Sequence, residues 1–325
     1  MKTVTYEQLG NPSDVLTVVQ KSPRAPGPGE VRVAVLSAPI HNADLLQVMG
    51  QYGRSPTLPA TPGSEGVGRV VEVGEGVTHL PVGATVFVSG GGTWTQQVTA
   101  PAARFVPLPP GDLDHLAMLV SSPATAHLML ENYVDLQEGD WVLQSAANSA
   151  VGSAVVQLAK ARGLRTVNLV RREEVVADLE KRGADVVLVG TDDLVARIEE
   201  ATGGASIRLA LDAVGGPVFK VLVDALGMGG TLVSYSQVVS EPAAIAPGDL
   251  IFKQITMVGF WLSQWFAQAS GEDKQALFAK LVPLVAGGGL SIAVDSSYSL
   301  DQIGAAVARS MGGRRDGKVM LHPNG

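Results

Sequence analysis

The 325-residue sequence contains no cysteine. Without a thiol, the chain cannot form a disulfide, use a thiolate nucleophile, or hold an iron–sulfur cluster or a cysteine-ligated zinc. Histidines are also few, and no two of them have the i, i+4 spacing of a helical zinc site. They are His41, His79, His115, His127 and His322. A G-x-S-x-G nucleophile elbow is absent as well, so hydrolases and metalloenzymes are disfavoured and we expect no metal.

Charged residues are scarce, at 17% of the chain against roughly 25% in an average soluble protein, while hydrophobic residues reach 46%. This composition excludes disorder for the bulk of the chain. The net charge is −7 and there is no basic tract, so nucleic acid and anionic membranes are disfavoured as partners. No apolar run approaches the roughly 18 residues of a membrane span, and the first residues lack the apolar core of a signal peptide. We therefore expect a soluble, cytoplasmic protein.

The length corresponds to two domains, at roughly 150 residues per domain. Residues 1–119 have the pattern of a β-rich domain, because short apolar runs such as 31–35 and 67–73 alternate with glycine and proline turns. One short helix is expected at about 43–49. Asp112 is a suitable N-cap for a further helix that runs toward Leu130.

Residues 120–262 change to an alternation of strands and helices, which predicts a doubly wound parallel sheet covered by helices on both faces. The predicted strands are 141–143, 166–170, 185–189, 208–213, 230–235 and 255–260. The predicted helices after the second strand are 173–182, 193–202 and 217–226. Because this six-stranded unit is then complete, we expect residues 263–325, with two more helices and two more strands, to return to the β-rich domain. The fold class is α/β.

Residues 141–152 predict a strand, a tight turn and the start of a helix. This is the arrangement that holds a dinucleotide pyrophosphate with free backbone N–H groups and the positive helix end. Of the usual glycine fingerprint only Gly152 remains, and the alanines and serines at the other places still allow a close backbone approach. We expect Ser145, Asn148 and Ser149 to add hydrogen bonds. The alternative is an ordinary βα turn without a ligand.

The end of the next predicted strand indicates which dinucleotide would bind. NAD-preferring folds place an acidic residue there to bind the ribose 2′-hydroxyl, whereas this chain has Arg171 and Arg172. Two guanidinium groups suit a 2′-phosphate, and therefore NADPH. The alternative is that both arginines are merely solvated at a helix start. Positive charge is unfavourable at that end of a helix, which favours an anionic partner.

The order of domains resembles the medium-chain dehydrogenase/reductase superfamily, in which a GroES-like β-rich catalytic domain is followed by a Rossmann domain and a C-terminal return. Within it, several segments resemble the zinc-free 2-enoyl thioester reductases. These are Gly50-Gln51-Tyr52-Gly53, Gly92-Thr93-Trp94, 148–152 and 259–265. The last segment, Gly-Phe-Trp-Leu-Ser-Gln-Trp, is the most specific, because a generic quinone reductase of the superfamily is not expected to carry it.

This resemblance implies that Tyr52 supplies or orients the proton. It also implies a set of coenzyme contacts that spans both predicted domains. They are Ser122, Asn148, Ser149, Ala150, Val151, Arg171, Arg172, Glu173, Tyr235, Ser236, Gln237, Val238, Phe260, Trp261, Leu262, Ser263 and Lys318. Trp261 and Trp265 follow the last Rossmann strand, where we expect the domains to meet. They are candidates for a substrate wall or for interdomain core, and Trp94 is a candidate cap of the same cleft.

The chain departs from the reductase pattern at several places. His41-Asn42-Ala43 stands where the reductases usually have Asn-Pro-Ser, Ser122 stands for Asn, and Ala150 for Gly. His41 is either an active-site acid in the substrate pocket or a histidine half-buried at a helix start. In the zinc-dependent relatives, Cys and His occupy the positions of His41 and Ser64, which agrees with a metal-free site.

The resulting hypothesis is an NADPH-dependent reduction of a 2-enoyl-CoA or 2-enoyl-acyl-carrier-protein thioester, with hydride transfer to the β-carbon and Tyr52 as the proton donor. A phenol suits this role because its ordinary pKa of about 10 keeps it protonated at neutral pH. Two alternatives stay open: an NADPH:quinone or alkenal (enone) reductase, and an NADPH-binding structural or regulatory protein with little turnover. We also expect a homodimer, because the edge strand near 255–260 is apolar.

Overall fold

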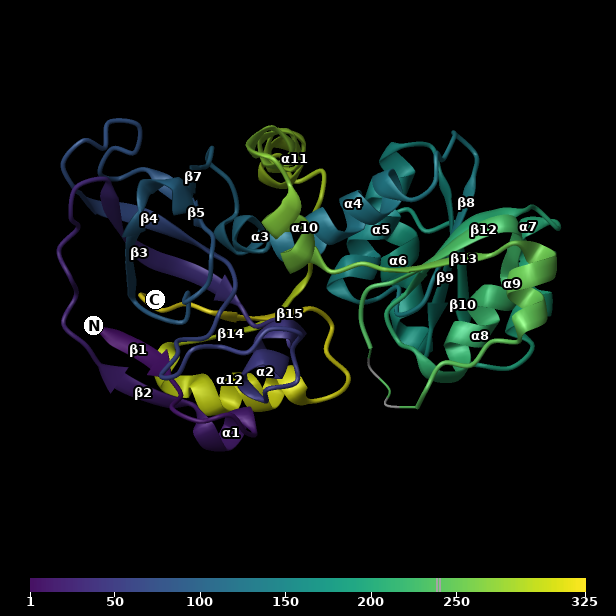
Figure 1. Ribbon diagram of the computed structural model, residues 1–325, viewed down its shortest axis with the longest axis horizontal. Coiled ribbons are helices and arrows are strands. Elements are labelled where there is room, and N and C mark those ends of the chain that lie inside the picture. Colours follow the sequence, from purple (N-terminus) through teal and green to yellow (C-terminus); the bar gives the residue numbers. More distant parts are fainter. Residues whose placement is uncertain (238, 240) are drawn as a thin grey trace. The chain divides into compact units, whose positions relative to one another are not determined.

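The computed structural model describes residues 1–237, 239 and 241–325, and these form two compact units (Figure 1). Unit 1 comprises Met1–Ser121 and Phe278–Gly325, and unit 2 comprises Ser122–Leu277. The first predicted boundary, after residue 119, lies two residues from this division, whereas the predicted return at 263 precedes the observed one by 15 residues. Val238, which the resemblance assigns to the coenzyme, lies outside the described residues.

Unit 1 is built on a seven-stranded sheet. Its main path runs β14 (Val294–Tyr298), β15 (Lys318–Leu321), β3 (Glu30–Pro39), β4 (Gly66–Val73), β5 (Thr85–Val88) and β7 (Phe105–Pro107), and β6 (Gln97–Pro101) also pairs with β3. In β3 every second residue faces the core, so that Val31, Val33 and Val35 are fully buried. This is the alternation that the sequence shows.

The remaining elements of unit 1 are short. They are β1 (Lys2–Thr5), α1 (Pro12–Val15), β2 (Thr17–Gln20), α2 (Asn42–Val48), η1 (Ala102–Arg104), α3 (Leu113–Ala117), η4 (Leu300–Gln302) and α12 (Ile303–Met311). α11 (Gly271–Ala286) begins in unit 2 and ends in unit 1.

The C-terminal segment pairs with the sheet of unit 1. β15 pairs antiparallel with β3, with Met320 opposite Pro39 and Leu321 opposite Ala38, and parallel with β14. In Figure 1 the yellow C-terminal strands therefore lie beside strands from the purple N-terminal part of the chain. The last residues of the sequence thus complete the sheet of unit 1.

Unit 2 contains the predicted six-stranded sheet, with all strands parallel. Its order is β10 (Val186–Val189), β9 (Arg165–Val170), β8 (Trp141–Gln144), β11 (Ile207–Asp212), β12 (Leu226–Ser234) and β13 (Thr256–Gly259). The chain order reverses between β8 and β11, so the carboxyl ends of these strands border the crevice in which doubly wound sheets bind ligands. The α/β fold class with a Rossmann sheet is confirmed.

Helices separate the strands of unit 2. They are α4 (Thr125–Asn132), α5 (Ala150–Ala161), η3 (Glu173–Val175), α6 (Val176–Lys181), α7 (Leu194–Thr202), α8 (Gly216–Ala225), α9 (Pro247–Lys253) and α10 (Leu262–Gln268). Across the described residues, no helix is both long enough and apolar enough to span a membrane.

The single helix predicted from Asp112 toward Leu130 is wrong in part. The N-cap is confirmed, because the Asp112 carboxylate accepts the amide of His115 at 3.0 Å. The helix then breaks into α3, a π-helical turn η2 (Val120–Ala124) and α4. Pro123 lies inside η2 and has no N–H to donate. The backbone amides of Val120 and Ser121 donate to the side-chain carboxylate of Glu65.

Candidate coenzyme and active site

The turn between β8 and α5 packs directly against the start of the helix. Ser149 is the N-cap of α5, and its hydroxyl accepts the amide of Gly152 at 3.1 Å. A Cβ atom on Gly152 would lie 2.6 Å from the carbonyl oxygen of Ala147 and 2.7 Å from that of Ala146. Ala146 itself has a left-handed backbone with φ of 50°. Glycine at 152 is therefore required by a close backbone approach.

The amide groups at the start of α5 are available to a ligand. The first N–H groups of a helix, here those of Ala150 and Val151, have no acceptor within the helix. Both residues are half-buried and Asn148 is exposed, so this turn is accessible from solvent. The twelve-residue α5 also places its positive end here. The predicted contacts at Asn148, Ser149, Ala150 and Val151 thus surround one helix N-terminus.

Asp212, at the end of β11, organises the neighbouring turns and was not predicted from the sequence. Its buried carboxylate accepts the Ser145 hydroxyl at 3.0 Å and the amides of Val214 and Gly215 at 3.0 to 3.2 Å. The Ser145 hydroxyl in turn accepts the amide of Ala213 at 2.9 Å. Ser145, a predicted coenzyme contact, is fully buried and uses its hydroxyl to join the two strands at the switch point.

Tyr235, directly after β12, carries a polar atom that lacks a partner. Its hydroxyl is buried and makes no hydrogen bond to the described residues. Burial raises the pKa of Tyr235 above its ordinary value and Asp212 adds to the effect, although the nearby Ser149 side chain opposes it. The phenol is thus held in its protonated form, as a buried donor beside the N-cap of α5. An orphaned donor here fits a bound group with hydrogen-bond acceptors. Its neighbour Ser236 is half-buried.

The two predicted arginines follow β9. Arg171 is exposed and makes no hydrogen bond or ion pair to the described residues. Arg172 is half-buried at the N-cap of η3. The open start of α5, the unpartnered hydroxyl of Tyr235 and the exposed guanidinium of Arg171 together fit a dinucleotide that carries an extra phosphate.

The tryptophan-rich segment begins after β13. Phe260 is buried, and its ring meets the ring of Tyr133 edge-on at 6.4 Å between centroids. Trp261 is the N-cap of α10, which continues with Leu262 and Ser263, and all three residues are half-buried. Trp265 is half-buried too and meets the ring of Phe266 edge-on at 5.1 Å. The predicted residues 260–263 and 265 thus lie together at the start of α10.

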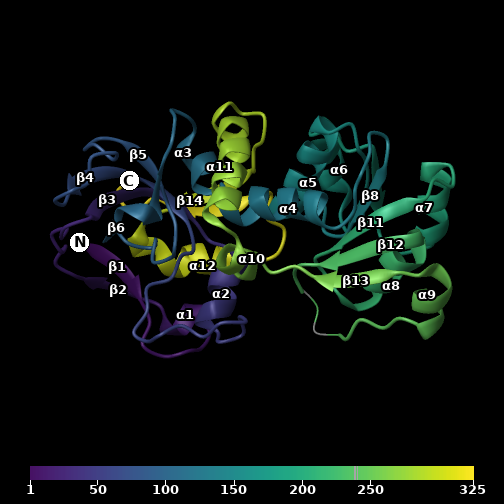
Figure 2. The ribbon, with the colours of Figure 1, turned by 45° about the horizontal axis from the view of Figure 1, so that its top comes forward.

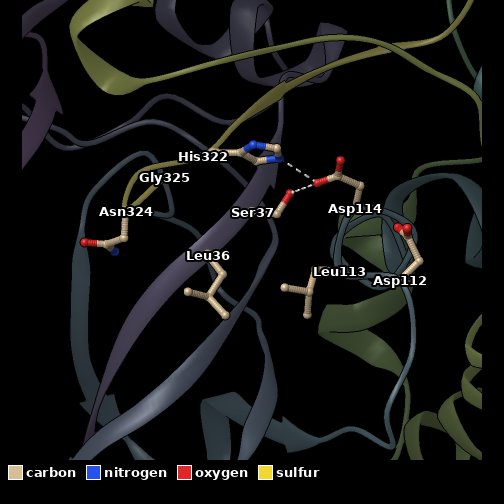
Figure 3. A pocket seen from close by; sticks show the side chains of 8 residues that line it. All are labelled: Leu36, Ser37, Asp112, Leu113, Asp114, His322, Asn324 and Gly325. Carbon is tan, nitrogen blue, oxygen red and sulfur yellow. Dashed lines mark hydrogen bonds and ion pairs between the residues drawn. The ribbon is translucent and has the colours of Figure 1, made fainter.

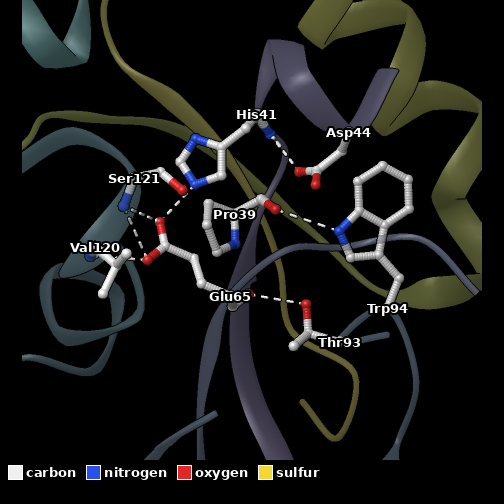
Figure 4. A network of polar contacts seen from close by, with 8 residues as sticks. All are labelled: Pro39, His41, Asp44, Glu65, Thr93, Trp94, Val120 and Ser121. Carbon is white, nitrogen blue, oxygen red and sulfur yellow. Dashed lines mark hydrogen bonds and ion pairs between the residues drawn. The ribbon is translucent and has the colours of Figure 1, made fainter. Parts of the chain in front are cut away.

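Unit 1 holds a buried network of ionisable side chains (Figure 4). His41 Nε2 lies 2.7 Å from Glu65 Oε1, and both side chains are almost fully buried. Glu65 also accepts the amide of Val120 at 2.8 Å and that of Ser121 at 3.1 and 3.2 Å. The backbone amide of His41 donates to Asp44 at 2.9 Å, which closes a capping box at the start of α2. Of the two interpretations of His41, burial at a helix start is observed, and a role as acid stays a prediction.

Two pKa shifts mark this network. Burial lowers the pKa of Lys318 to about 8, and Arg315 adds to the lowering while Asp44 and Glu65 oppose it. Burial raises the pKa of Asp44, and the opposing effects of His41, Ser64 and Lys318 are smaller. Lys318, a predicted coenzyme contact, is therefore mostly cationic at pH 7, and its pKa lies close to this pH. Such perturbed groups cluster at functional sites.

The other predicted residues of unit 1 differ in exposure. Tyr52 is half-buried in the loop after α2. Trp94, the candidate cap of the cleft, is fully buried in the hydrophobic core of the unit, and its indole N–H donates to the carbonyl of Pro39 at 3.2 Å. Ser122 is buried in η2. In this conformation Trp94 is a core residue, so its part in substrate binding stays a prediction.

A hollow in unit 1, of about 430 Å³, is lined by none of the predicted site residues (Figure 3). At its wall Asp114 accepts the Ser37 hydroxyl at 2.6 Å, and His322 Nε2 lies 2.8 Å from the same carboxylate oxygen. Because serine and histidine both bind the aspartate, they do not form the serine–histidine pair of a hydrolase. The contacts join β3 and the residue that follows β15 to α3.

Comparison with known proteins places the chain among the reductases. The profile of the alcohol dehydrogenase GroES-like domain matches residues 27–110, and that of the zinc-binding dehydrogenases matches residues 150–281. The mitochondrial enoyl-[acyl-carrier-protein] reductase of Homo sapiens is 36% identical over 321 residues, which cover 96% of this chain and 86% of the human protein. The chain belongs to the medium-chain dehydrogenase/reductase superfamily.

Solved structures of this superfamily match nearly the whole chain. Etr1p in complex with NADP and crotonyl-CoA has a TM-score of 0.89 at 26% identity, over 99% of each chain. Etr1p is also known in a heterodimer with Etr2p from Candida tropicalis, as a 2-enoyl thioester reductase. A mycobacterial quinone oxidoreductase has a TM-score of 0.85 at 28% identity, over 99% of this chain and 100% of that one.

The zinc that one of the profiles names finds no set of donors here. Within the part of the chain that the structure describes, no group of three or more histidine, aspartate or glutamate side chains could hold a metal. His41 is bonded to Glu65, and the sequence has no cysteine. No step of the mechanism is therefore assigned to zinc.

Proposed function

We propose that this protein reduces the carbon–carbon double bond of a 2-enoyl thioester with NADPH. The observation that carries the proposal is the arrangement at the switch point of unit 2, where the open start of α5 lies beside the orphaned hydroxyl of Tyr235. The 36% identity to a mitochondrial enoyl-[acyl-carrier-protein] reductase supports the substrate class. The complex of Etr1p with NADP and crotonyl-CoA supports both coenzyme and substrate.

The residues of unit 2 hold the coenzyme. The amides of Ala150 and Val151 bind the pyrophosphate, Arg171 and Arg172 bind the 2′-phosphate, and the Tyr235 hydroxyl donates a hydrogen bond. When bound, NADPH supplies the hydride that adds to the β-carbon of the unsaturated thioester. Asp212 holds the turns around this site through its hydrogen bonds with Ser145, Val214 and Gly215.

Tyr52 delivers the proton that completes the reaction. Hydride addition to the β-carbon places negative charge on the thioester as an enolate, and a phenol at neutral pH carries a proton that it can donate. The α-carbon takes this proton, and water then reprotonates the phenolate. The products are the saturated thioester and NADP⁺.

The substitution Tyr52→Phe tests this assignment. Loss of one such donor typically raises the barrier by about 2.7–4 kcal/mol, so we expect kcat with crotonyl-CoA to fall by about 10² to 10³. The Kd of NADPH should stay unchanged. Tyr298→Phe is the matched control, because Tyr298 is a half-buried tyrosine of β14 at the edge of the core of unit 1, and should keep kcat within about twofold of wild type. Equal kcat in Y52F and wild type rejects Tyr52 as donor.

A quinone or alkenal reductase is the second candidate. It is favoured by the similarity to a mycobacterial quinone oxidoreductase, whose structure matches 99% of the chain. Both candidates use the same coenzyme site and differ only in the acceptor. Comparison of acceptors with the wild-type enzyme separates them.

A homodimer formed through the free edge of the unit 2 sheet is part of the proposal. β13 is one of the two edge strands of this sheet, and α9 precedes it along the chain (Figure 2). This segment exposes Ile251 and Phe252, at 64% and 77% of their surface, together with part of Met257. An apolar edge of this kind is normally covered. Phe252→Glu should convert a dimer into a monomer in analytical ultracentrifugation, and a monomeric wild-type protein contradicts the idea.

A cytoplasmic location also stays a prediction. It rests on the composition of the chain. The curated relative from Homo sapiens is a mitochondrial protein. Immunolocalisation in the source cells decides between the two locations.

A further inference from the structure

The Glu65 carboxylate is the most heavily bonded ionisable group in the network of unit 1. It is 2% exposed and accepts hydrogen bonds from His41 Nε2, from the amide of Val120 and from the amide of Ser121, all between 2.7 and 3.2 Å. Figure 4 shows the three donors converging on its two oxygens. Hydrogen bonds to a charged acceptor are about twice as strong as neutral ones.

The loop that carries Glu65 is itself fixed. The Thr93 hydroxyl donates to the backbone carbonyl of Glu65 at 2.8 Å. Gly63, two residues earlier, has a φ of +95°, and a Cβ atom there would lie 2.3 Å from the Trp94 ring. The carboxylate thus projects from a rigid loop rather than from a mobile one.

The two amides that Glu65 binds lie at the start of the π-helical turn η2. Single π turns are rare and occur frequently at functional sites. This turn contains the last residues of unit 1, Val120 and Ser121, and the first residue of unit 2, Ser122. Ser122 is one of the coenzyme contacts that the resemblance implies. The geometry of η2 therefore determines where Ser122 lies.

We propose that Glu65 is a positioning residue for the coenzyme: its carboxylate, oriented by His41, fixes the backbone of Val120 and Ser121 and so the turn that carries Ser122. This inference rests on the proposed function, because it assumes that Ser122 serves NADPH binding. His41 acts only through Glu65. The imidazole gives the carboxylate a third donor and prevents it from rotating away from the two amides.

The three donors require a carboxylate, rather than an amide, at position 65. Three donors face Glu65, and a carboxylate has acceptor positions only. Glu65→Gln replaces one acceptor oxygen by an NH₂ group, which then faces the N–H of either His41 or η2. His41→Gln keeps a donor near the position of Nε2, whereas His41→Leu removes it. Comparison of His41→Gln with His41→Leu therefore distinguishes the effect of the hydrogen bond from the effect of side-chain volume.

The experiment measures the Kd of NADPH by coenzyme fluorescence for wild type, E65Q, H41Q and H41L, with thermal unfolding of each. We expect the Kd to rise at least tenfold in E65Q and H41L and less than threefold in H41Q. Thr93→Val is the matched control, because it removes a buried hydrogen bond to the backbone of the same residue. It should lower the melting temperature and leave the Kd within twofold of wild type.

A second measurement addresses the turn directly, even if E65Q folds poorly. Amide exchange of the peptide that covers residues 118–125 should be slow in wild type and H41Q and at least tenfold faster in H41L. Any one of three results overturns the inference. The first is an unchanged Kd of NADPH in E65Q, and the second is equal Kd values in H41Q and H41L. The third is a rise of the Kd in T93V that equals the rise in H41L. Crotonyl-CoA turnover by wild type is recorded in parallel. A wild-type protein that binds NADPH but does not turn over crotonyl-CoA refutes the proposed function. In that case the Kd values of the variants still test whether Glu65 positions the coenzyme.

Discussion

Substitution of Gly152 by alanine tests the turn that is proposed to bind the pyrophosphate. The new Cβ atom would lie 2.6 to 2.7 Å from three backbone atoms, namely the carbonyl oxygens of Ala146 and Ala147 and the Cα of Ala147. Real Cβ contacts are not this short, and a backbone cannot rotate away as a flexible side chain can. The turn must therefore move relative to α5.

The magnitude follows from two opposing effects. Overpacking of a close contact costs roughly 1–3 kcal/mol, and a clash with three backbone atoms belongs at the upper end. Alanine also favours the helix over glycine by about 1 kcal/mol. We therefore expect G152A to lose about 2 kcal/mol of unfolding free energy. Displacement of the N–H groups should raise the Kd of NADPH about tenfold, which corresponds to about 1.4 kcal/mol.

Gly304→Ala is the control for this prediction. Gly304 is an exposed position inside α12, and a Cβ atom there meets no other atom within 4 Å. This substitution should stabilise the protein by about 0.5–1 kcal/mol and leave NADPH binding unchanged. The assays are urea unfolding followed by circular dichroism and titration of NADPH fluorescence. If G152A unfolds like wild type and binds NADPH with the same Kd, the close approach of the turn is not required and the argument fails.

Two further predictions concern charge. Arg171→Ala should raise the Kd of NADPH by about 10- to 100-fold, the range of a lost hydrogen bond to a charged group, and that of NADH less than threefold. Arg24→Ala, which affects an arginine paired with Glu30, is the control, and equal losses for both coenzymes contradict the 2′-phosphate role. In the folded protein Arg309 is the main cause that lowers the pKa of Asp295 from 3.8 to about 2. The ionised carboxylate therefore stabilises the fold above pH 4, and this contribution is lost as the pH falls toward 2. D295N should lose about 2 kcal/mol at pH 7 and depend less on pH between 4 and 2 in urea unfolding, whereas a parallel pH dependence to wild type refutes the linkage.

Much of the fold could be predicted because periodicity is a local property of the sequence. The alternation in β3 and the apolar runs of unit 2 identify strands from neighbouring residues alone. The six parallel strands and the return of β15 to β3 follow from the number of elements and from the completeness of the Rossmann unit. Gly152 and Ser149 were also predictable, because the start of a helix has its own local chemistry.

The buried polar networks could not be predicted in this way. Glu65 binds donors that lie 24, 55 and 56 residues away in the sequence, and Asp212 binds Ser145 across 67 residues. No local pattern encodes such pairs. The only sequence signal for Asp212 was an acidic residue at the end of a mostly apolar strand, where burial requires partners. The π-helical turn that contains Pro123 also makes long-range hydrogen bonds to Glu65.

The burial of Trp94 and Tyr52 could not be predicted from the residues around them in the sequence. Trp94 follows three glycines closely in the sequence and was predicted to cap the cleft. The structure places it in the hydrophobic core of unit 1, where its indole N–H donates a hydrogen bond to the carbonyl of Pro39. Tyr52, in a similar glycine-flanked loop, is half-buried. Only the packing around each loop distinguishes the two aromatic residues.

The central claim is that NADPH reduces the double bond of a thioester on this scaffold. The most direct test measures NADPH oxidation by the wild-type protein with crotonyl-CoA, a free alkenal and a benzoquinone under the same conditions. The account predicts that kcat/KM is highest for crotonyl-CoA, at least tenfold above the other two acceptors, and that butyryl-CoA accumulates in equal amount to NADP⁺. A higher kcat/KM for the quinone or the alkenal, or NADPH oxidation without butyryl-CoA, contradicts it.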